Sequence, residues 1–263
     1  MLRATIISLL VAATSSLLVA APAQAQPSPL AAIGDSYMAG IGAGDYLDAD
    51  GCRRSDHSYA ADVSRRTGDD LVDASCPGAR IPQVLEQSAT IPVDRAWVLV
   101  QVGGNDIGFG EIAAACLLSS ASNCLSRIAE AESRLPQLSQ GLADIAASAR
   151  DRAPQARIIM AGYPRLLASP RQCASTGVGS LLEGPEIAAI NALQARLDAT
   201  IREAARGAQA RFVDWPRVVD QHSLCSSRPW FVTIGTGDLG DALHPTREAY
   251  AAMGRDIARV LRR

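Results

Sequence analysis

The chain has 263 residues, 48% of them hydrophobic, and a formal net charge of −2. Because acidic and basic residues are mixed along the chain without a long basic block, the charge pattern argues against a nucleic-acid partner. Aromatic residues make up only 4% of the chain, which argues against a platform of stacked rings that would bind polysaccharide.

The first 25 residues have the pattern of a secretory signal peptide. Arg3 gives a positive start, residues 6–21 are almost wholly apolar, and Ala23-Gln24-Ala25 is a small-x-small cleavage pattern. We expect cleavage after Ala25 and a secreted, extracellular protein without a permanent membrane anchor. The alternative interpretation of the same residues is a membrane anchor. Residues 26–263 are expected to form a single domain and a monomer.

After this segment, short apolar runs alternate with helical patterns. Strands are predicted at residues 30–33, 71–74, 97–102, 157–161 and 211–213. Helices are predicted near residues 59–66, 125–150, 186–205 and 247–261. This alternation predicts an α/β fold with a parallel sheet that helices cover on both faces.

Polar or glycine-rich motifs follow the first three predicted strands. Ser36 ends the motif Gly34-Asp35-Ser36, Gly78 lies in Cys76-Pro77-Gly78-Ala79, and Asn105 lies in Gly103-Gly104-Asn105-Asp106. In open parallel sheets, ligands bind beyond the carboxyl ends of the strands. Ser36, Gly78 and Asn105 are therefore expected at one edge of the sheet.

A further motif, Asp241-Ala242-Leu243-His244-Pro245, stands near the end of the chain. A serine hydroxyl becomes a strong nucleophile when a base takes its proton, and His244, His57 and His222 are the candidates for that base. Asp241 precedes His244 by three residues, a spacing that can bring a carboxylate to the imidazole N–H. The alternative is a solvated loop carboxylate.

A tetrahedral intermediate of acyl transfer carries an oxyanion that needs hydrogen-bond donors. The candidates are the backbone N–H groups of Ser36 and Gly78 and the side-chain amide of Asn105. Taken singly, Gly78 and Asn105 could be ordinary turn residues. Asp35 and Asp106 are expected to be structural, Asp35 by accepting backbone N–H groups near Ser36 and Asp106 by stiffening the Asn105 loop.

These four motifs, in this order, resemble the signature blocks of the SGNH (GDSL-type) hydrolase family. Tyr37 stands where the nominal Gly-Asp-Ser-Leu string has leucine. The resemblance implies a three-layer α/β/α sandwich with about five parallel strands, flavodoxin-like in type. It also implies a serine ester hydrolase with Ser36, His244 and Asp241 as catalytic residues, although some secreted relatives orient the histidine with a backbone carbonyl instead of an acid.

The chain holds six cysteines, at positions Cys52, Cys76, Cys116, Cys124, Cys173 and Cys225. An even count in an exported protein favours disulfides, and the lack of any Cys-x-x-Cys motif argues against a metal site. The residues alone leave the pairing open. The family resemblance, closest to secreted lipases and esterases of actinomycetes, implies the sequential pairs Cys52–Cys76, Cys116–Cys124 and Cys173–Cys225.

The expected reaction is hydrolysis of acyl esters of glycerol, phospholipid or simple alcohols through an acyl-enzyme, without a cofactor or metal. One alternative is a carbohydrate O-deacetylase or acyltransferase that uses the same residues. Another is a non-catalytic binding module on the same fold. Residues 106–124, with Phe109 and Leu117, form either a wall for the acyl chain or an ordinary packed helix.

Overall fold

The computed structural model describes residues 28–47 and 50–262, so the predicted signal peptide and its cleavage site lie outside the described residues. The strands are β1 (Leu30–Gly34), β2 (Tyr46–Leu47), β3 (Arg54–Ser55), β4 (Leu71–Asp73), β5 (Trp97–Gln101), β6 (Arg157–Ala161) and β7 (Arg211–Val213). The α-helices are α1 (Ser36–Ala39), α2 (Tyr59–Thr67), α3 (Ile81–Ser88), α4 (Phe109–Leu118), α5 (Ala121–Arg152), α6 (Pro170–Cys173), α7 (Gly184–Gly207), α8 (Arg217–Asp220) and α9 (Arg247–Leu261). Two short 3-10 helices are η1 (Val178–Ser180) and η2 (Leu239–Asp241).

Five of the strands form one sheet in the order β4-β1-β5-β6-β7, and every neighbouring pair is parallel. This is the strand order of flavodoxin-like sheets, in which the chain reverses direction of winding beside the first strand. Of the three inner strands, β1 and β5 are buried along their whole length, and β6 is buried except at its first residue. Their consecutive apolar residues are typical of a parallel strand that is covered by helices on both faces. The strands β2 and β3 form a separate antiparallel pair.

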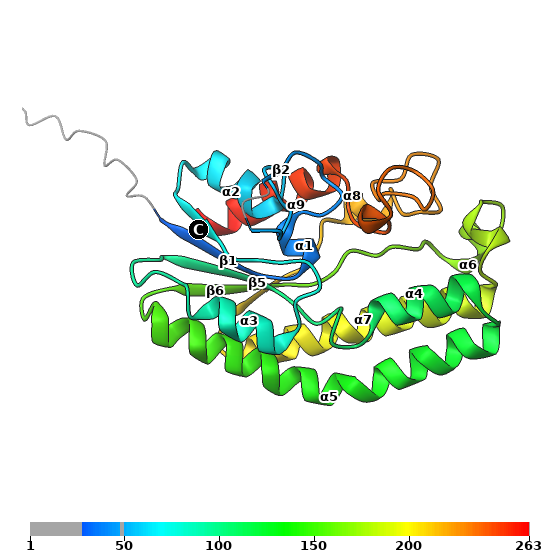
Figure 1. The fold of residues 1–263 in the computed structure, drawn as a ribbon, viewed down its shortest axis with the longest axis horizontal. Coiled ribbons are helices and arrows are strands. Elements are labelled where there is room, and N and C mark those ends of the chain that lie inside the picture. The colour runs from blue at the N-terminus through cyan, green and yellow to red at the C-terminus, as the bar shows by residue number, and fades with distance from the viewer. Residues whose placement is uncertain (1–27, 48–49, 263) are drawn as a thin grey trace, which may run out of the picture.

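Helices cover both faces of the sheet (Figure 1). The helices α2 and α9 lie on one face, and α3, α5 and α7 lie on the other. Each layer buries apolar side chains against the sheet, such as Met253 and Ile257 of α9 and Leu142 and Ile145 of α5. The predicted three-layer α/β/α sandwich is confirmed. No helix in the described part of the chain is long and apolar enough to span a membrane.

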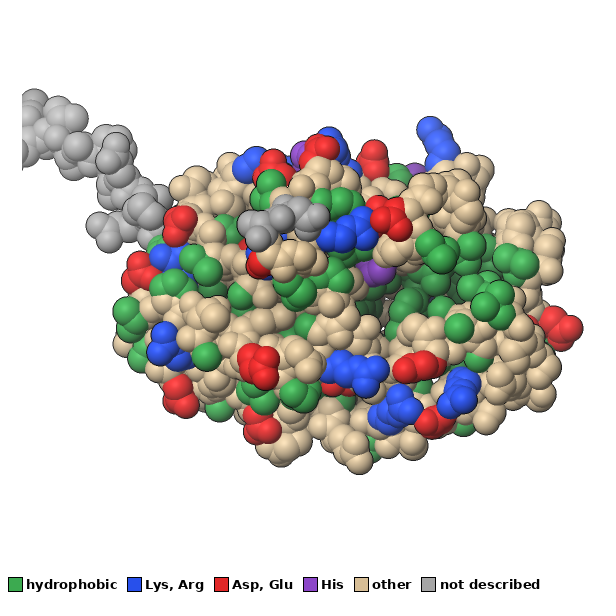
Figure 2. Space-filling model, in the orientation of Figure 1, with side chains coloured by type: hydrophobic (Ala, Val, Ile, Leu, Met, Phe, Trp, Pro, Cys, Tyr) green, Lys and Arg blue, Asp and Glu red, His purple; other side chains and the backbone are tan. Residues whose placement is uncertain are grey.

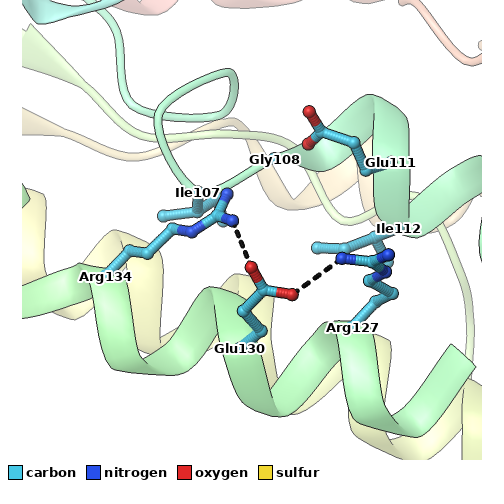
Figure 3. Close-up of a pocket in the computed structure, with 7 residues that line it drawn as sticks. All are labelled: Ile107, Gly108, Glu111, Ile112, Arg127, Glu130 and Arg134. Carbon is cyan, nitrogen blue, oxygen red and sulfur yellow. Dashed lines mark hydrogen bonds and ion pairs between the residues drawn. The ribbon is translucent and has the colours of Figure 1, made fainter. Parts of the chain in front are cut away.

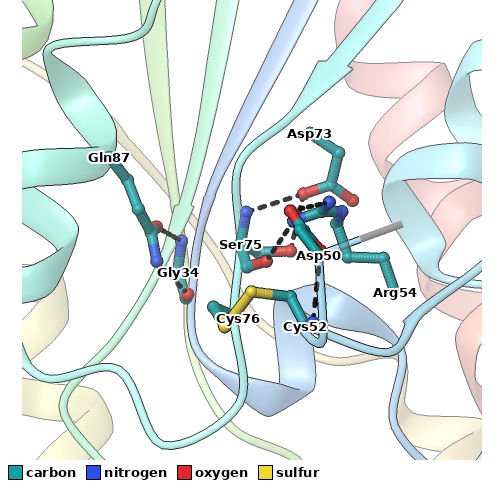
Figure 4. Close-up of a disulfide and its surroundings, with 8 residues drawn as sticks. All are labelled: Gly34, Asp50, Cys52, Arg54, Asp73, Ser75, Cys76 and Gln87. Carbon is teal, nitrogen blue, oxygen red and sulfur yellow. Dashed lines mark hydrogen bonds and ion pairs between the residues drawn. A yellow bond between two sulfur atoms is a disulfide. The ribbon is translucent and has the colours of Figure 1, made fainter. Parts of the chain in front are cut away.

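The six cysteines pair as the family resemblance implies, Cys52 with Cys76, Cys116 with Cys124 and Cys173 with Cys225. The first disulfide joins the loop after β2 to the loop after β4 (Figure 4). In that second loop, the backbone N–H of Cys76 donates to the carbonyl of Gly34 at 3.0 Å. The side chain of Gln87 also makes two hydrogen bonds with Gly34. It accepts from the N–H of Gly34 at 2.7 Å and donates to its carbonyl at 3.1 Å. The hydrogen bond to Gly34 places Cys76 beside the turn that carries Ser36, and the disulfide ties Cys76 to the loop after β2.

Candidate active site

Ser36 begins α1 directly after the end of β1, so its side chain stands at the carboxyl edge of the sheet. Asp35 caps this short helix by accepting the N–H of Tyr37 at 3.0 Å. The strand end before it passes very close to β5, because a Cβ atom at Gly34 would lie 2.2 Å from the carbonyl oxygen of Gln101. Only glycine permits this approach, and it lets the chain turn sharply into Ser36.

His244 reaches Ser36 from the other end of the chain. Its Nε2 lies 2.8 Å from the Oγ of Ser36, although the two residues are 208 positions apart. The hydroxyl of Tyr37 donates to the carbonyl of Leu243 at 3.1 Å, and the rings of Tyr37 and His244 have centroids 5.1 Å apart. At Gly42 an added Cβ would lie 3.0 Å from the Cβ of His244. The histidine is therefore packed closely between the α1 turn and the loop that follows it, residues 40–44, which contains Gly40, Gly42 and Gly44.

The structure corrects the expectation that the Asp241 carboxylate faces the imidazole. The Nδ1 of His244 lies 3.1 Å from the carbonyl oxygen of Ala242. The Oδ1 of Asp241 instead accepts from a guanidinium nitrogen of Arg53 at 3.0 Å. Arg53 offers the Asp241 carboxylate a charge-assisted hydrogen bond. Leu243, which stands between Ala242 and His244 in the sequence, has a left-handed conformation (φ 66°). A backbone carbonyl takes the position expected for the acid.

Burial sets the protonation state of His244. Desolvation lowers the pKa of its imidazole below the usual 6.5, and the contact with the Ala242 carbonyl opposes this to a lesser degree. A lowered pKa keeps the ring neutral at neutral pH. A neutral imidazole whose Nδ1–H donates to a carbonyl has its Nε2 lone pair available for the Ser36 proton.

The three candidate oxyanion donors come from loops after three adjacent strands, Ser36 after β1, Gly78 after β4 and Asn105 after β5. Gly78 has a left-handed conformation (φ 77°). The Nδ2 of Asn105 donates to the carbonyl of Ala79 at 3.1 Å. This bond ties the Asn105 loop to the Gly78 loop, and it uses one of the two hydrogens of the amide group.

Two aspartates beside these residues have the structural contacts expected of them. Burial raises the pKa of Asp35 to about 7, and its carboxylate accepts from the N–H of Tyr37 and the hydroxyl of Tyr163. The Oδ1 of Asp106 accepts from the N–H of Ile81 at 3.0 Å, which ties the Asn105 loop to the start of α3. Desolvation raises the pKa of Asp106 as well.

An open pocket of about 360 Å³ borders Asn105. Its other lining residues are Arg80, Gly108, Gly110, Glu111 and Ala114. A smaller pocket of about 90 Å³ lies next to it between α4 and α5, and there Glu130 bridges Arg127 and Arg134 (Figure 3). Within residues 28–47 and 50–262, no group of three or more His, Cys, Asp or Glu is placed to hold a metal ion.

One face of the molecule is hollowed above α4 (Figure 2). Hydrophobic side chains gather along this hollow, and a histidine side chain is visible inside it. The helix α4 itself carries two partly buried apolar residues, Phe109 and Leu117, and ends at Leu118, which is 85% exposed. The segment 106–124 therefore contains a helix, and both the acyl-chain wall and the ordinary packed helix stay open as interpretations of it.

Two residues that the structure brings to the site were not predicted from the sequence. Arg53 pairs with Asp241, and the hydroxyl of Tyr163 contacts both Asp35 and the N–H of Gly104. Tyr163 follows the predicted strand 157–161, so the strand-end rule that selected Ser36 and Asn105 also applies to it. Arg53 has no such signal, because its role depends on a loop almost 190 residues further along the chain.

Comparisons with known proteins cover nearly the whole chain. The model of the GDSL-like Lipase/Acylhydrolase family matches residues 32–252. The chain is 36% identical over 250 residues to Lipase 1 of Streptomyces coelicolor, covering 91% of this chain and 90% of that protein. It is also 36% identical over 253 residues to a lipase of Streptomyces rimosus, covering 89% and 92% respectively.

Solved structures show the same similarity. The crystal structure of phospholipase A1 from Streptomyces albidoflavus matches with a TM-score of 0.81 and 28% identity, covering 90% of this chain and 100% of that one. The extracellular lipase from Streptomyces rimosus matches with a TM-score of 0.81 and 31% identity, covering 89% and 99%. The likeness thus extends over the entire fold and is not limited to the short motifs.

Proposed function

The chain belongs to the GDSL-like lipase/acylhydrolase family and is a carboxylic ester hydrolase, and on this premise we propose that Ser36 and His244 catalyse the hydrolysis through an acyl-enzyme. The observation that carries the proposal is the 2.8 Å contact between Ser36 Oγ and His244 Nε2. A hydroxyl within hydrogen-bond reach of a neutral imidazole is an activated nucleophile.

In the proposed mechanism, Ser36 Oγ attacks the ester carbonyl while His244 Nε2 takes the hydroxyl proton. The oxyanion accepts hydrogen bonds from the N–H of Ser36, the N–H of Gly78 and the Nδ2 of Asn105, and loss of one such donor costs about 10²- to 10³-fold in rate. His244 then protonates the leaving alcohol. It next deprotonates a water molecule that attacks the acyl-enzyme and regenerates Ser36. The Ala242 carbonyl orients the imidazole in both steps.

The proposed substrates are acyl esters of glycerol, phospholipid or simple alcohols. The names of the relatives support this range, since they include lipases and a phospholipase A1. We further propose that the protein is secreted after removal of residues 1–25, leaving residues 26–263 as one monomeric domain. The signal-like composition of that segment, the three disulfides and the extracellular relative support this part of the proposal.

Hydrolysis of p-nitrophenyl esters from acetyl to palmitoyl tests the function. Turnover by the wild type is expected to fall by about 10³-fold or more in Ser36→Ala and in His244→Ala, because either change removes the activated nucleophile. The matched controls are His57→Ala and His222→Ala, which alter the other two histidines and are expected to retain turnover. Full turnover in Ser36→Ala contradicts the proposal. An optimum restricted to acetyl esters favours the O-deacetylase alternative.

We propose that Phe109 and Leu117 line the wall for the acyl chain. Replacing either residue by alanine widens the site, so the chain-length optimum is expected to move toward longer acyl groups. We expect the preference for longer over shorter acyl groups, measured as relative kcat/KM, to change by about 10- to 200-fold, which corresponds to about 1 to 3 kcal/mol. Val93→Ala is the control, since Val93 is 72% exposed in the loop between α3 and β5. An unchanged profile in both α4 variants contradicts the assignment.

A further inference from the structure

The hydroxyl of Tyr163 lies between the two loops that supply the proposed oxyanion donors. It donates to the Oδ2 of Asp35, and it accepts from the N–H of Gly104 at 3.1 Å. Asp35 directly precedes Ser36, and Gly104 directly precedes Asn105. One oxygen atom therefore contacts the neighbour of the nucleophile and the neighbour of the amide donor.

Tyr163 is itself held rigidly. The residue is only 7% exposed, and its ring packs edge-on against Tyr37 with centroids 5.1 Å apart. Its backbone N–H donates to Asp198 at 2.8 Å, and its carbonyl accepts from Gln194 at 2.9 Å. Because both partners belong to the long helix α7, the position of the hydroxyl is fixed by the body of the fold.

The direction of the two hydrogen bonds follows from the charges. Burial and the nearby Asp35 raise the pKa of Tyr163 well above its usual value of 10.0, so the phenol keeps its proton. The only proton it has goes to the Asp35 carboxylate, which leaves its oxygen to accept from Gly104. The hydrogen bond from Tyr163 lowers the pKa of Asp35 and so partly offsets the effect of burial, which raises it.

We propose that Tyr163 is a positioning residue that sets the spacing between Ser36 and Asn105 around the oxyanion. The inference rests on the roles proposed above for those two residues. Oxyanion donors act only when they lie at hydrogen-bond distance from the position where charge develops. A displacement of about 1 Å can cost about 10²-fold in rate. A hydroxyl that is hydrogen-bonded to both loops prevents them from moving apart by such a distance.

The variant Tyr163→Phe tests the proposal, because it keeps the ring and removes only the hydroxyl. We expect kcat on a p-nitrophenyl ester to fall about 10- to 100-fold while KM changes less than about threefold, since the alignment matters most in the transition state. Rates are expressed per active site titrated with a phosphonate, so an unfolded fraction does not count. Tyr59→Phe is the control. Its ring is fully buried, and its hydroxyl makes no hydrogen bond within the described part of the chain.

A double-mutant cycle with Asn105→Ala distinguishes positioning from a general loss of packing. If Tyr163 acts by placing Asn105, adding Tyr163→Phe to Asn105→Ala lowers kcat by less than about threefold. An equal loss in both backgrounds, or a kcat of Tyr163→Phe within about twofold of the wild type, overturns the inference. Full activity in Asn105→Ala would instead show that the proposed oxyanion hole is wrong.

Asp35→Asn provides a second route if Tyr163→Phe does not fold. The amide keeps the size of the side chain and removes the charged acceptor of the tyrosine hydroxyl. The same loss of kcat, the same small change of KM and the same non-additivity with Asn105→Ala are expected. Simple additivity in this pair overturns the inference as well.

Discussion

The atom that faces His244 Nδ1 determines how much Asp241 contributes to catalysis. A backbone carbonyl occupies that position at 3.1 Å, while the carboxylate pairs with Arg53. Asp241 raises the pKa of His244 through its charge, and Arg53 lowers it. The two charges therefore oppose one another at the imidazole, and the carbonyl supplies the orientation.

The variant Asp241→Asn is accordingly expected to lower kcat/KM by less than about tenfold. Loss of the charge at a facing triad acid costs about 10⁴-fold in serine proteases, whereas here the imidazole keeps its carbonyl partner. Steady-state kinetics on one p-nitrophenyl ester, with His244→Ala measured in parallel, checks the prediction. A loss of about 10³-fold or more would show that Asp241 turns to the imidazole during the reaction.

The pH profile should follow the burial of His244. Only the neutral imidazole accepts the Ser36 proton, and desolvation lowers its pKa. The acid limb of kcat/KM is therefore expected below pH 6.5, and activity persists into mildly acid solution. The pKa of Asp35 is also raised, to about 7, so its titration could add a second acid limb. The profile is therefore also measured for Asp35→Asn, in which the acid limb of kcat/KM due to His244 is expected to remain. A limb above pH 6.5 in that variant contradicts the account.

At the scale of elements, the strands of the parallel sheet were the most predictable part of the chain, whereas the short pair β2 and β3 was not predicted. The apolar runs that end at a glycine or a charged residue gave β1, β5, β6 and β7 to within one residue, and α9 begins and ends where its pattern predicts. The helix α3 was missed. Its N-cap is Arg80, a poor capping residue, and its first N–H is satisfied by Asp106 from a loop 25 residues away. Local signals remain in Pro82 and Gln83 of the first turn, but the support from Asp106 leaves none.

The site shows the same division. The position of Ser36, Gly78 and Asn105 at one edge of the sheet was predictable, because strand ends in a parallel sheet meet there. The orientation of Asp241 was not, because a spacing of three residues fits a carboxylate that faces the imidazole and one that faces Arg53 equally well. Only the folded arrangement of two distant loops decides between them.

The disulfides connect loops and helices, which the hydrogen bonds of the sheet do not join. We expect removal of Cys173–Cys225 by paired serine substitutions to cost about 4 kcal/mol of unfolding free energy, against about 2.5 kcal/mol for Cys116–Cys124. The reason is loop length, since these bridges span 52 and 8 residues. Urea unfolding of both variants checks the order. Equal or reversed losses would show that native contacts, rather than chain entropy, dominate.

At the scale of the whole molecule, the sandwich buries several carboxyl groups away from water. Burial raises the pKa of Asp35 and of Asp198 to about 7 and that of Asp73 to about 6 (Figure 4 shows Asp73). A raised folded-state pKa contributes stability that is complete below the unfolded value near 3.8. That stability is lost as pH rises through the folded value. These groups therefore favour the folded state at mildly acid pH.

The variant Asp198→Asn tests this linkage. The unfolding free energy of the wild type is expected to lose a few kcal/mol to Asp198 between about pH 4 and 8, because one pKa unit corresponds to about 1.4 kcal/mol. The asparagine variant should show a shallower decline over that range. Asp151→Asn, at an exposed position in α5, is the control. Identical slopes for Asp198→Asn and the wild type would contradict a buried, proton-linked Asp198.

The most direct test of the account is to map the covalent intermediate. The folded protein is treated with a p-nitrophenyl phosphonate, digested, and its peptides are analysed by mass spectrometry. We expect one phosphonyl group on Ser36, a loss of activity in proportion to that label, and greatly slowed labelling in His244→Ala but not in Asp241→Asn. Inactivation with the label on another residue, or full activity with Ser36 completely labelled, would contradict it.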